Sequence, residues 1–113
     1  MIKSHPETMV DLHTHTTASD GTLTPEGLAE LAAEKGLAAV AVTDHDTVAG
    51  VAAAQARGDE LGVHVVPGLE LGARWDGGGS LHLLGYYVDT SNPRLRERLR
   101  EFTDGRRARA AHR

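Results

Sequence analysis

The chain contains 113 residues, with 12 Lys and Arg, 16 Asp and Glu and 7 His, and it carries a formal charge of −4 at pH 7. Its length suits one domain, and its 40% of hydrophobic and 25% of charged residues are typical of a soluble globular protein. The absence of Cys excludes disulfides, thiolate zinc sites and cysteine nucleophiles. No apolar run approaches the roughly 20 residues of a membrane-spanning helix. Residues 1–8 form a polar leader without the apolar segment of a secretory signal, so we expect a cytoplasmic protein with no membrane partner.

The first part of the chain predicts a strand, a helix and a second strand. Residues 9–13 form a short strand candidate of mixed polarity. Thr24 is a typical helix N-cap with Pro25 at the first helical position, and Gly36 is a typical stop for that helix. The continuous apolar run over 37–43 predicts a strand that is buried on both faces.

The rest of the chain continues the alternation of helices and strands, which predicts parallel α/β architecture. Residues 94–113 are rich in Arg, and this fits either a solvated helix with ion pairs or a surface that attracts a polyanionic substrate. The remaining expected elements are a helix capped by Asp46 or Thr47 and ending near Leu61, a strand over 63–66 that breaks at Pro67-Gly68 and resumes over 69–71, a strand over 80–88, and a helix that starts at Asn92-Pro93.

The segment Asp11-Leu12-His13-Thr14-His15 is the strongest local signal for chemistry. Alternate side chains of a strand share a face, so His13 and His15 are expected to point the same way. Two imidazoles at this spacing can bind one divalent metal, and Asp11 behind them could hold the tautomer of a ring. Two loop histidines bonded to the backbone would show the same pattern, so the motif alone leaves both interpretations open.

Four further residues of metal-ligand type lie near the ends of the expected strands. Asp20 follows the first strand, His45 the second and Glu70 the third, and His82 lies near the start of the fourth. In parallel α/β barrels the carboxyl ends of successive strands meet at one rim, where catalytic groups collect. Each residue alone also fits a turn, a helix cap, a solvated strand end or a core histidine. Together they predict a metal site at one rim.

These segments resemble the PHP (polymerase and histidinol phosphatase) domain family, from Met9 onward along the chain. Within that family the chain looks closest to the phosphoesterases that act on nucleoside 3′,5′-bisphosphates and trim short RNA from its 5′ end. The motifs that carry the resemblance are His13-Thr14-His15, Thr43-Asp44-His45, Pro67-Gly68-Leu69-Glu70 and His82-Leu83-Leu84-Gly85-Tyr86, together with Asp20-Gly21-Thr22-Leu23-Thr24-Pro25 and Asp46-Thr47-Val48-Ala49-Gly50.

The resemblance implies both a fold and a set of metal ligands. The fold is α/β, the N-terminal part of a distorted seven-stranded TIM-like barrel with up to three divalent metals at its rim. Mn²⁺ is the expected metal. Zn²⁺, Fe²⁺ and Mg²⁺ are alternatives, because imidazole and carboxylate ligands do not choose among these ions. The implied ligands are His13, His15 and Glu70 for one metal, Glu70 and His82 for a second, and Asp20 and His45 for a third, with Asp11 and Asp44 behind them.

The activity implied by the resemblance is hydrolysis of phosphomonoesters of nucleotides or of the 5′ ends of short RNA. A metal-bound hydroxide would attack phosphorus, with the ligands His13, His15 and Glu70 activating the water. The family's later strands contribute a further His and an Asp-x-His motif that this chain lacks. We therefore expect residues 9–113 to be the N-terminal half of the domain, with the other half as a partner.

Such a half-domain would keep two protein ligands for each metal, so we expect weak metal affinity and little turnover by this chain alone. Two alternatives stay open. One is a non-catalytic PHP-like module that stabilises a partner. The other is an amidohydrolase-type metal hydrolase, which also opens with a His-x-His motif on its first strand.

Overall fold

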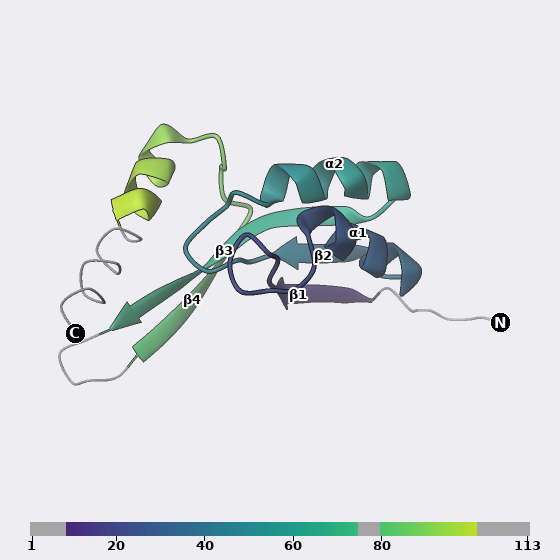
Figure 1. Ribbon diagram of the computed structural model, residues 1–113, viewed down its shortest axis with the longest axis horizontal. Helices are drawn as coiled ribbons and strands as arrows, with labels where there is room; N and C mark the ends of the chain where they lie inside the picture. The colour runs from purple at the N-terminus through teal and green to yellow at the C-terminus, as the bar shows by residue number, and fades with distance from the viewer. Residues whose placement is uncertain (1–8, 75–79, 102–113) are drawn as a thin grey trace.

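The computed structural model describes residues 9–74 and 80–101, and Figure 1 shows their arrangement. A four-stranded sheet with the order β1-β2-β3-β4 is the frame of the fold. None of the helices in these two ranges is long and apolar enough to cross a membrane. The elements are β1 (Val10–Thr14), α1 (Pro25–Glu34), β2 (Ala39–Val42), α2 (Val51–Leu61), β3 (His64–Arg74), β4 (Ser80–Tyr86) and a helical segment over 93–101.

The sheet is mixed rather than wholly parallel. β1 pairs with β2 and β2 with β3 in parallel, as predicted, but β4 runs antiparallel to β3. The expectation of a fully parallel sheet is therefore wrong for the last strand. Only residues 75–79 separate β3 from β4, whereas a parallel crossover needs about a dozen residues or more.

β3 is one continuous strand, in contrast to the predicted break at Pro67-Gly68. Its first residues, 64–67, pair with β2, and its residues 68–74 pair with β4. Pro67 therefore lies at the point where β3 exchanges one partner for the other, and its carbonyl accepts a hydrogen bond of 3.2 Å from the backbone of Val88. A Cβ atom on Gly68 would lie 2.6 Å from the carbonyl oxygen of Gly85, so the close approach of β4 requires glycine here.

The sequence signals for the first helix are confirmed. Thr24 caps α1 by accepting a hydrogen bond of 2.9 Å from the backbone of Gly27, and Pro25 occupies the first turn. Gly36, with a φ of 77°, follows the helix in the left-handed conformation that glycine favours.

α2 begins later than predicted, because Asp46 and Thr47 do not cap it. Its N-cap is Gly50. The backbone N–H of Asp46 instead donates to the carbonyl of Glu70 at 2.9 Å, so the chain still follows β3 at this point. Asp46 also has a φ of 54°, which is incompatible with the start of a right-handed helix.

The helical segment over 93–101 begins where the sequence predicts it. Asn92 accepts a hydrogen bond of 2.8 Å from the backbone of Arg94 through its side chain, and Leu99 is buried. The arginines of this segment are exposed, which fits a solvated helix face, and residues 102–113 lie outside the described part of the chain. These arginines are Arg94, Arg96, Arg98 and Arg100.

The hydrophobic core lies between the helices and the sheet. α1 packs against α2, α1 contacts β2, and α2 contacts β3 (Figure 1). Burial of these aliphatic side chains fixes the positions of the strand ends that carry the polar residues. The core cluster consists of Leu28, Ala32, Val40, Val42, Val51, Ala54, Val63 and Val65.

Gly58 allows α2 to approach β3 closely, and we expect Gly58→Ala to destabilise the protein. A Cβ atom there would lie 2.6 Å from both the carbonyl oxygen of Val63 and a methyl group of Val65. Overpacking of this kind costs about 1–3 kcal/mol and should outweigh the gain in helix propensity of about 1 kcal/mol. Urea denaturation measures the difference. Gly72→Ala is the control, because a Cβ atom there meets nothing within 4 Å. A Gly58→Ala protein as stable as wild type would contradict the close contact.

Candidate metal centre

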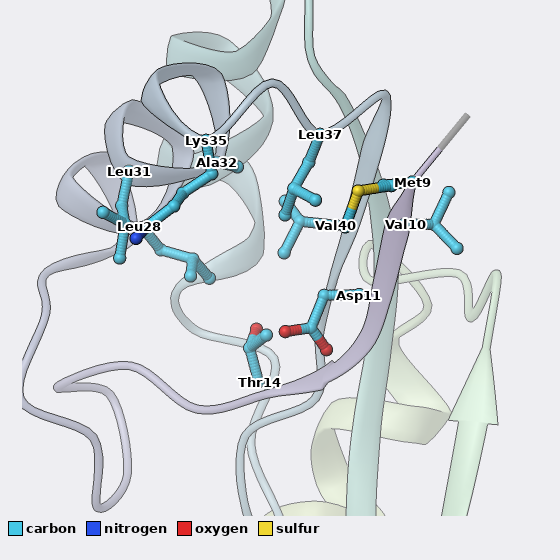
Figure 2. A pocket seen from close by; sticks show the side chains of 10 residues that line it. All are labelled: Met9, Val10, Asp11, Thr14, Leu28, Leu31, Ala32, Lys35, Leu37 and Val40. Carbon is cyan, nitrogen blue, oxygen red and sulfur yellow. The ribbon is translucent and has the colours of Figure 1, made fainter. Parts of the chain in front are cut away.

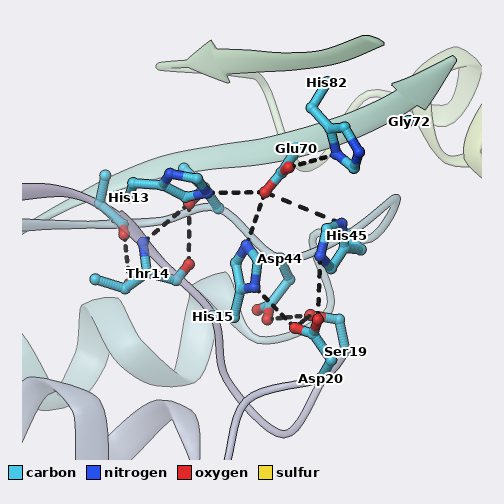
Figure 3. Close-up of polar contacts among 12 residues, drawn as sticks. His13, Thr14, His15, Ser19, Asp20, Asp44, His45, Glu70, Gly72 and His82 are labelled. Carbon is cyan, nitrogen blue, oxygen red and sulfur yellow. Dashed lines mark hydrogen bonds and ion pairs between the residues drawn. The ribbon is translucent and has the colours of Figure 1, made fainter. Parts of the chain in front are cut away.

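Six side chains from separate parts of the chain lie together at one end of the sheet (Figure 3). β1 contributes the first, and the loop that follows it contributes the next two. The segment after β2, the middle of β3 and the start of β4 contribute one each. In chain order these residues are His13, His15, Asp20, His45, Glu70 and His82.

Glu70 lies at the centre of this cluster and is only 5% exposed. Its Oε1 atom lies 2.8 Å from Nε2 of His13 and 2.8 Å from Nε2 of His15. Its Oε2 atom lies 2.7 Å from Nδ1 of His82, and Nδ1 of His45 is 4.0 Å from Oε1. One buried carboxylate therefore faces four imidazoles, which come from β1 and the loop directly after it, from the segment after β2 and from β4.

Asp20 forms a second, more exposed centre of negative charge. Its Oδ1 atom lies 2.8 Å from Nδ1 of His15, and its Oδ2 atom lies 3.1 Å from Nε2 of His45. The His15 ring thus lies between two carboxylates, with one nitrogen facing each (Figure 3). The two carboxylates and their histidines form one continuous polar cluster.

Both central carboxylates are held in the ionised form. Burial raises the pKa of Glu70, but hydrogen bonds from His13, His15 and His82 and the charge of His45 outweigh it, so that the pKa falls to about 2. For Asp20, desolvation raises the pKa and the charges of His45 and His15 lower it, with a net decrease. Both carboxylates of the cluster are therefore ionised at neutral pH.

The cluster contains three groups of side chains whose ligand atoms are close enough to hold a metal ion. Three residues each belong to two of the groups. A neutral imidazole has one lone pair for a metal, whereas a carboxylate can bridge two ions, so the groups do not provide independent sets of three ligands. The groups are His13, His15 and Glu70; His15, Asp20 and His45; and His45, Glu70 and His82.

Asp11 contacts the backbone of His13, whereas the sequence predicted a contact with an imidazole ring. Its carboxylate accepts a hydrogen bond of 3.2 Å from the backbone N–H of His13. The pairing of β1 with β2 shifts between Asp11 and Thr14, as in a β-bulge. Such an irregularity re-aims the side chains around it, so the simple alternation used to place Asp11 behind the rings does not hold here.

Buried hydroxyl groups of threonines support the cluster, and sequence reasoning missed them. Thr43 is fully buried, and its hydroxyl donates to the carbonyl of Thr14 at 2.9 Å and accepts from its N–H at 3.1 Å. Thr16, also fully buried, donates through its N–H and its hydroxyl to the carboxylate of Asp44. In the sequence, polar residues at strand ends look like solvated loop residues. Their burial and their hydrogen-bond partners become visible only in the structure.

A separate concavity of about 400 Å³ lies between β1, β2 and α1 (Figure 2). Apolar side chains such as Leu28, Leu31 and Val40 line most of it, with Asp11 and Lys35 as its charged residues. It contains none of the six clustered side chains. This hollow is therefore distinct from the candidate metal centre.

Proteins of known name match this chain over most of its length. A model of the PHP domain matches residues 11–103. The 5′-3′ exoribonuclease Rnm of Salmonella typhimurium is 41% identical over 101 residues, which cover 88% of this chain and 34% of that protein. The 3′,5′-nucleoside bisphosphate phosphatase of Chromobacterium violaceum is 37% identical over 101 residues, or 89% and 35% of the two chains. The chain spans about a third of the length of these relatives.

Two solved structures share the fold. One, named as an amidohydrolase from Chromobacterium violaceum with bound sulfate and no metal, has a TM-score of 0.83 at 35% identity and covers 91% of this chain and 36% of its own. The other, provisionally named as a metal-dependent phosphoesterase from Bifidobacterium adolescentis, has a TM-score of 0.76 at 38% identity and covers 85% and 33%. The predicted fold class, an α/β sheet that forms part of a larger TIM-like fold, is confirmed. With the match to the domain model, these likenesses show that the chain belongs to the PHP domain family.

Proposed function

We propose that this chain provides the metal site of a phosphoesterase that hydrolyses phosphomonoesters of nucleotides or of the 5′ ends of short RNA. The observation that carries the proposal is the position of Glu70, whose two carboxylate oxygens lie 2.7–2.8 Å from nitrogens of three imidazoles. The names of the matched exoribonuclease and bisphosphate phosphatase support the substrate class.

The donor atoms of the cluster fit a divalent transition metal. Imidazole nitrogens and carboxylate oxygens suit Mn²⁺, Zn²⁺ and Fe²⁺ and do not choose among them, and we propose Mn²⁺ as the metal that the resemblance to the PHP family implies. The six residues of the cluster would hold the ions, and Glu70 belongs to two of the three groups. Mg²⁺ fits less well, because it prefers oxygen ligands.

The residues of the cluster have distinct tasks in this proposal. Divalent ions, when bound, neutralise the charge of a phosphate group and lower the pKa of a coordinated water. Glu70 forms the buried floor of the site, while the side chains of His13 and His82 are 53% and 55% exposed. Substrate would therefore approach from the side of these two rings. Without cations, the ionised Glu70 and Asp20 would repel a phosphate group.

We further propose that residues 9–113 act as the N-terminal half of a PHP domain. The chain covers about a third of the length of its relatives, which supports its being one part of a larger domain. The sharing of His15, His45 and Glu70 between groups supports it too, because additional ligands are needed to complete each metal site. The other half of the domain would supply these ligands and is the partner that we expect.

Removal of both histidines of the first motif should abolish metal binding at the first group. His13→Ala with His15→Ala leaves Glu70 as its only ligand, and His15 also belongs to the Asp20 group. We expect the number of Mn²⁺ ions bound at saturation, measured by equilibrium dialysis, to fall by at least one per chain. His64→Ala is the matched control, because His64 contacts Tyr87 and none of the clustered residues in the described structure. An unchanged metal content in the double variant would refute the site.

Hydrolysis of a nucleoside 3′,5′-bisphosphate tests the activity. We expect phosphate release that requires Mn²⁺ and stops with EDTA, at a low rate because the metal ligands are shared. The rate should rise when the remainder of a PHP domain is supplied with the chain. Release of phosphate is measured by colorimetry, with Glu70→Gln as the inactive variant.

The outcomes of this assay separate the three interpretations of the chain. Metal binding without release of phosphate under either condition would favour the non-catalytic module. Hydrolysis of a cyclic amide in preference to a phosphate ester would favour the amidohydrolase alternative.

A further inference from the structure

The loop between β1 and α1 is tied to a buried carboxylate that is not part of the metal-ligand cluster. Asp44 is fully buried. Its Oδ1 atom accepts hydrogen bonds of 2.6 Å from the N–H of Thr16 and 2.6 Å from the hydroxyl of Ser19, and its Oδ2 atom accepts one of 2.8 Å from the hydroxyl of Thr16 (Figure 3).

These bonds fix the residues on either side of Asp20. The hydroxyl of Ser19 contacts Asp44, and the carbonyl of Thr16 accepts hydrogen bonds from the N–H groups of Ser19 at 3.0 Å and Gly21 at 2.8 Å. A Cβ atom on Gly21 would collide with the carbonyl of His15, so the loop is closed tightly on itself. The position of Asp20 therefore depends on the bonds that hold its two neighbours.

Asp44 also reaches the other parts of the cluster through its backbone. Its carbonyl accepts a hydrogen bond of 2.9 Å from the N–H of Glu70. The next residue, His45, pairs with Glu70 in an isolated β-bridge. One buried residue thus connects the loop of Asp20, the segment of His45 and the strand of Glu70.

We infer that Asp44, through Ser19 and Thr16, is the positioning residue that holds Asp20 against His15 and His45 and so sets the affinity of that group for a divalent cation. This inference rests on the proposed metal site. It assigns no contact between Asp44 and the ion, since the carboxylate of Asp44 accepts its hydrogen bonds from Thr16 and Ser19 of the loop. Outer hydrogen bonds of this kind change metal affinity by about ten- to a hundredfold.

The test is a Zn²⁺ titration of the 113-residue chain, followed by the ¹⁵N resonances of the individual histidine rings. Zn²⁺ is the probe because it is diamagnetic and a coordinated ring nitrogen shifts. In Ser19→Ala, we expect Nε2 of His45, the nitrogen that faces Asp20, to require about tenfold more Zn²⁺ than in wild type. His13, which belongs only to the group of His15 and Glu70, should respond as before. Ser19 is only half-buried, so this variant should keep the fold.

Asp44→Ala should raise the Zn²⁺ concentration that His45 requires by more than Ser19→Ala does. Asp44→Asn should raise it less, because the amide oxygen can still accept hydrogen bonds from Ser19 and from the N–H of Thr16. Ser91→Ala is the matched control, since it removes a similar hydroxyl–carboxylate bond, 2.7 Å to Asp89, outside the cluster. Where Asp44→Ala does not fold, Ser19→Ala decides.

The outcomes for the two proposals differ. Equal Zn²⁺ requirements at His45 in wild type and Ser19→Ala would overturn the positioning role and leave the metal site intact. Similar increases in the Zn²⁺ requirements of His13 and His45 would also overturn it, because they would indicate that the fold as a whole has loosened. If no ring nitrogen of the wild-type chain shifts, the metal site itself is refuted, and this inference with it.

Discussion

The contact between the Glu70 carboxylate and the surrounding imidazoles is the interaction on which the site depends. A carboxylate that is 5% exposed is costly unless it is paired or hydrogen-bonded. Here the partners come from β1, from the segment after β2 and from β4. The same contacts that satisfy the charge therefore also tie together elements that are distant in the sequence.

The mixed sheet explains how these groups meet. The parallel strands β1 and β2 deliver His15 and His45 at their carboxyl ends, next to β3. β3 then continues past the end of β2 and pairs with β4, which returns in the opposite direction. In that register Gly72 faces His82 and Glu70 faces Leu84, so His82 is a diagonal neighbour of Glu70 on the same face. If β4 ran parallel to β3, the register between the two strands would differ, and His82 would not take this position beside Glu70.

Local sequence signals predicted what short-range physics determines. The Thr24-Pro25 cap, the apolar strand within 37–43 and the collection of polar residues at strand ends follow from rules that need no tertiary structure. The start of α2 could not be predicted in this way, because Asp46 is held by the backbone of β3 instead of opening a helix. The resemblance places Asp11 and Asp44 behind the ligands, but the contact of Asp11 with the backbone depends on the irregular pairing of β1, and the partners of Asp44 depend on the burial of Thr16. Both are consequences of packing.

The arrangement of His15 shows why a cation suits this cluster. Its Nδ1 atom faces Asp20 and its Nε2 atom faces Glu70, each at 2.8 Å. A neutral imidazole donates from one nitrogen only, so both carboxylates are satisfied at once only if a second positive centre, a proton or a metal ion, is present. Protons and metal ions therefore compete for the same positions, and uptake of a metal releases protons. Because Asp44 holds Asp20 in place through Ser19, the loop keeps this second position open for either of them.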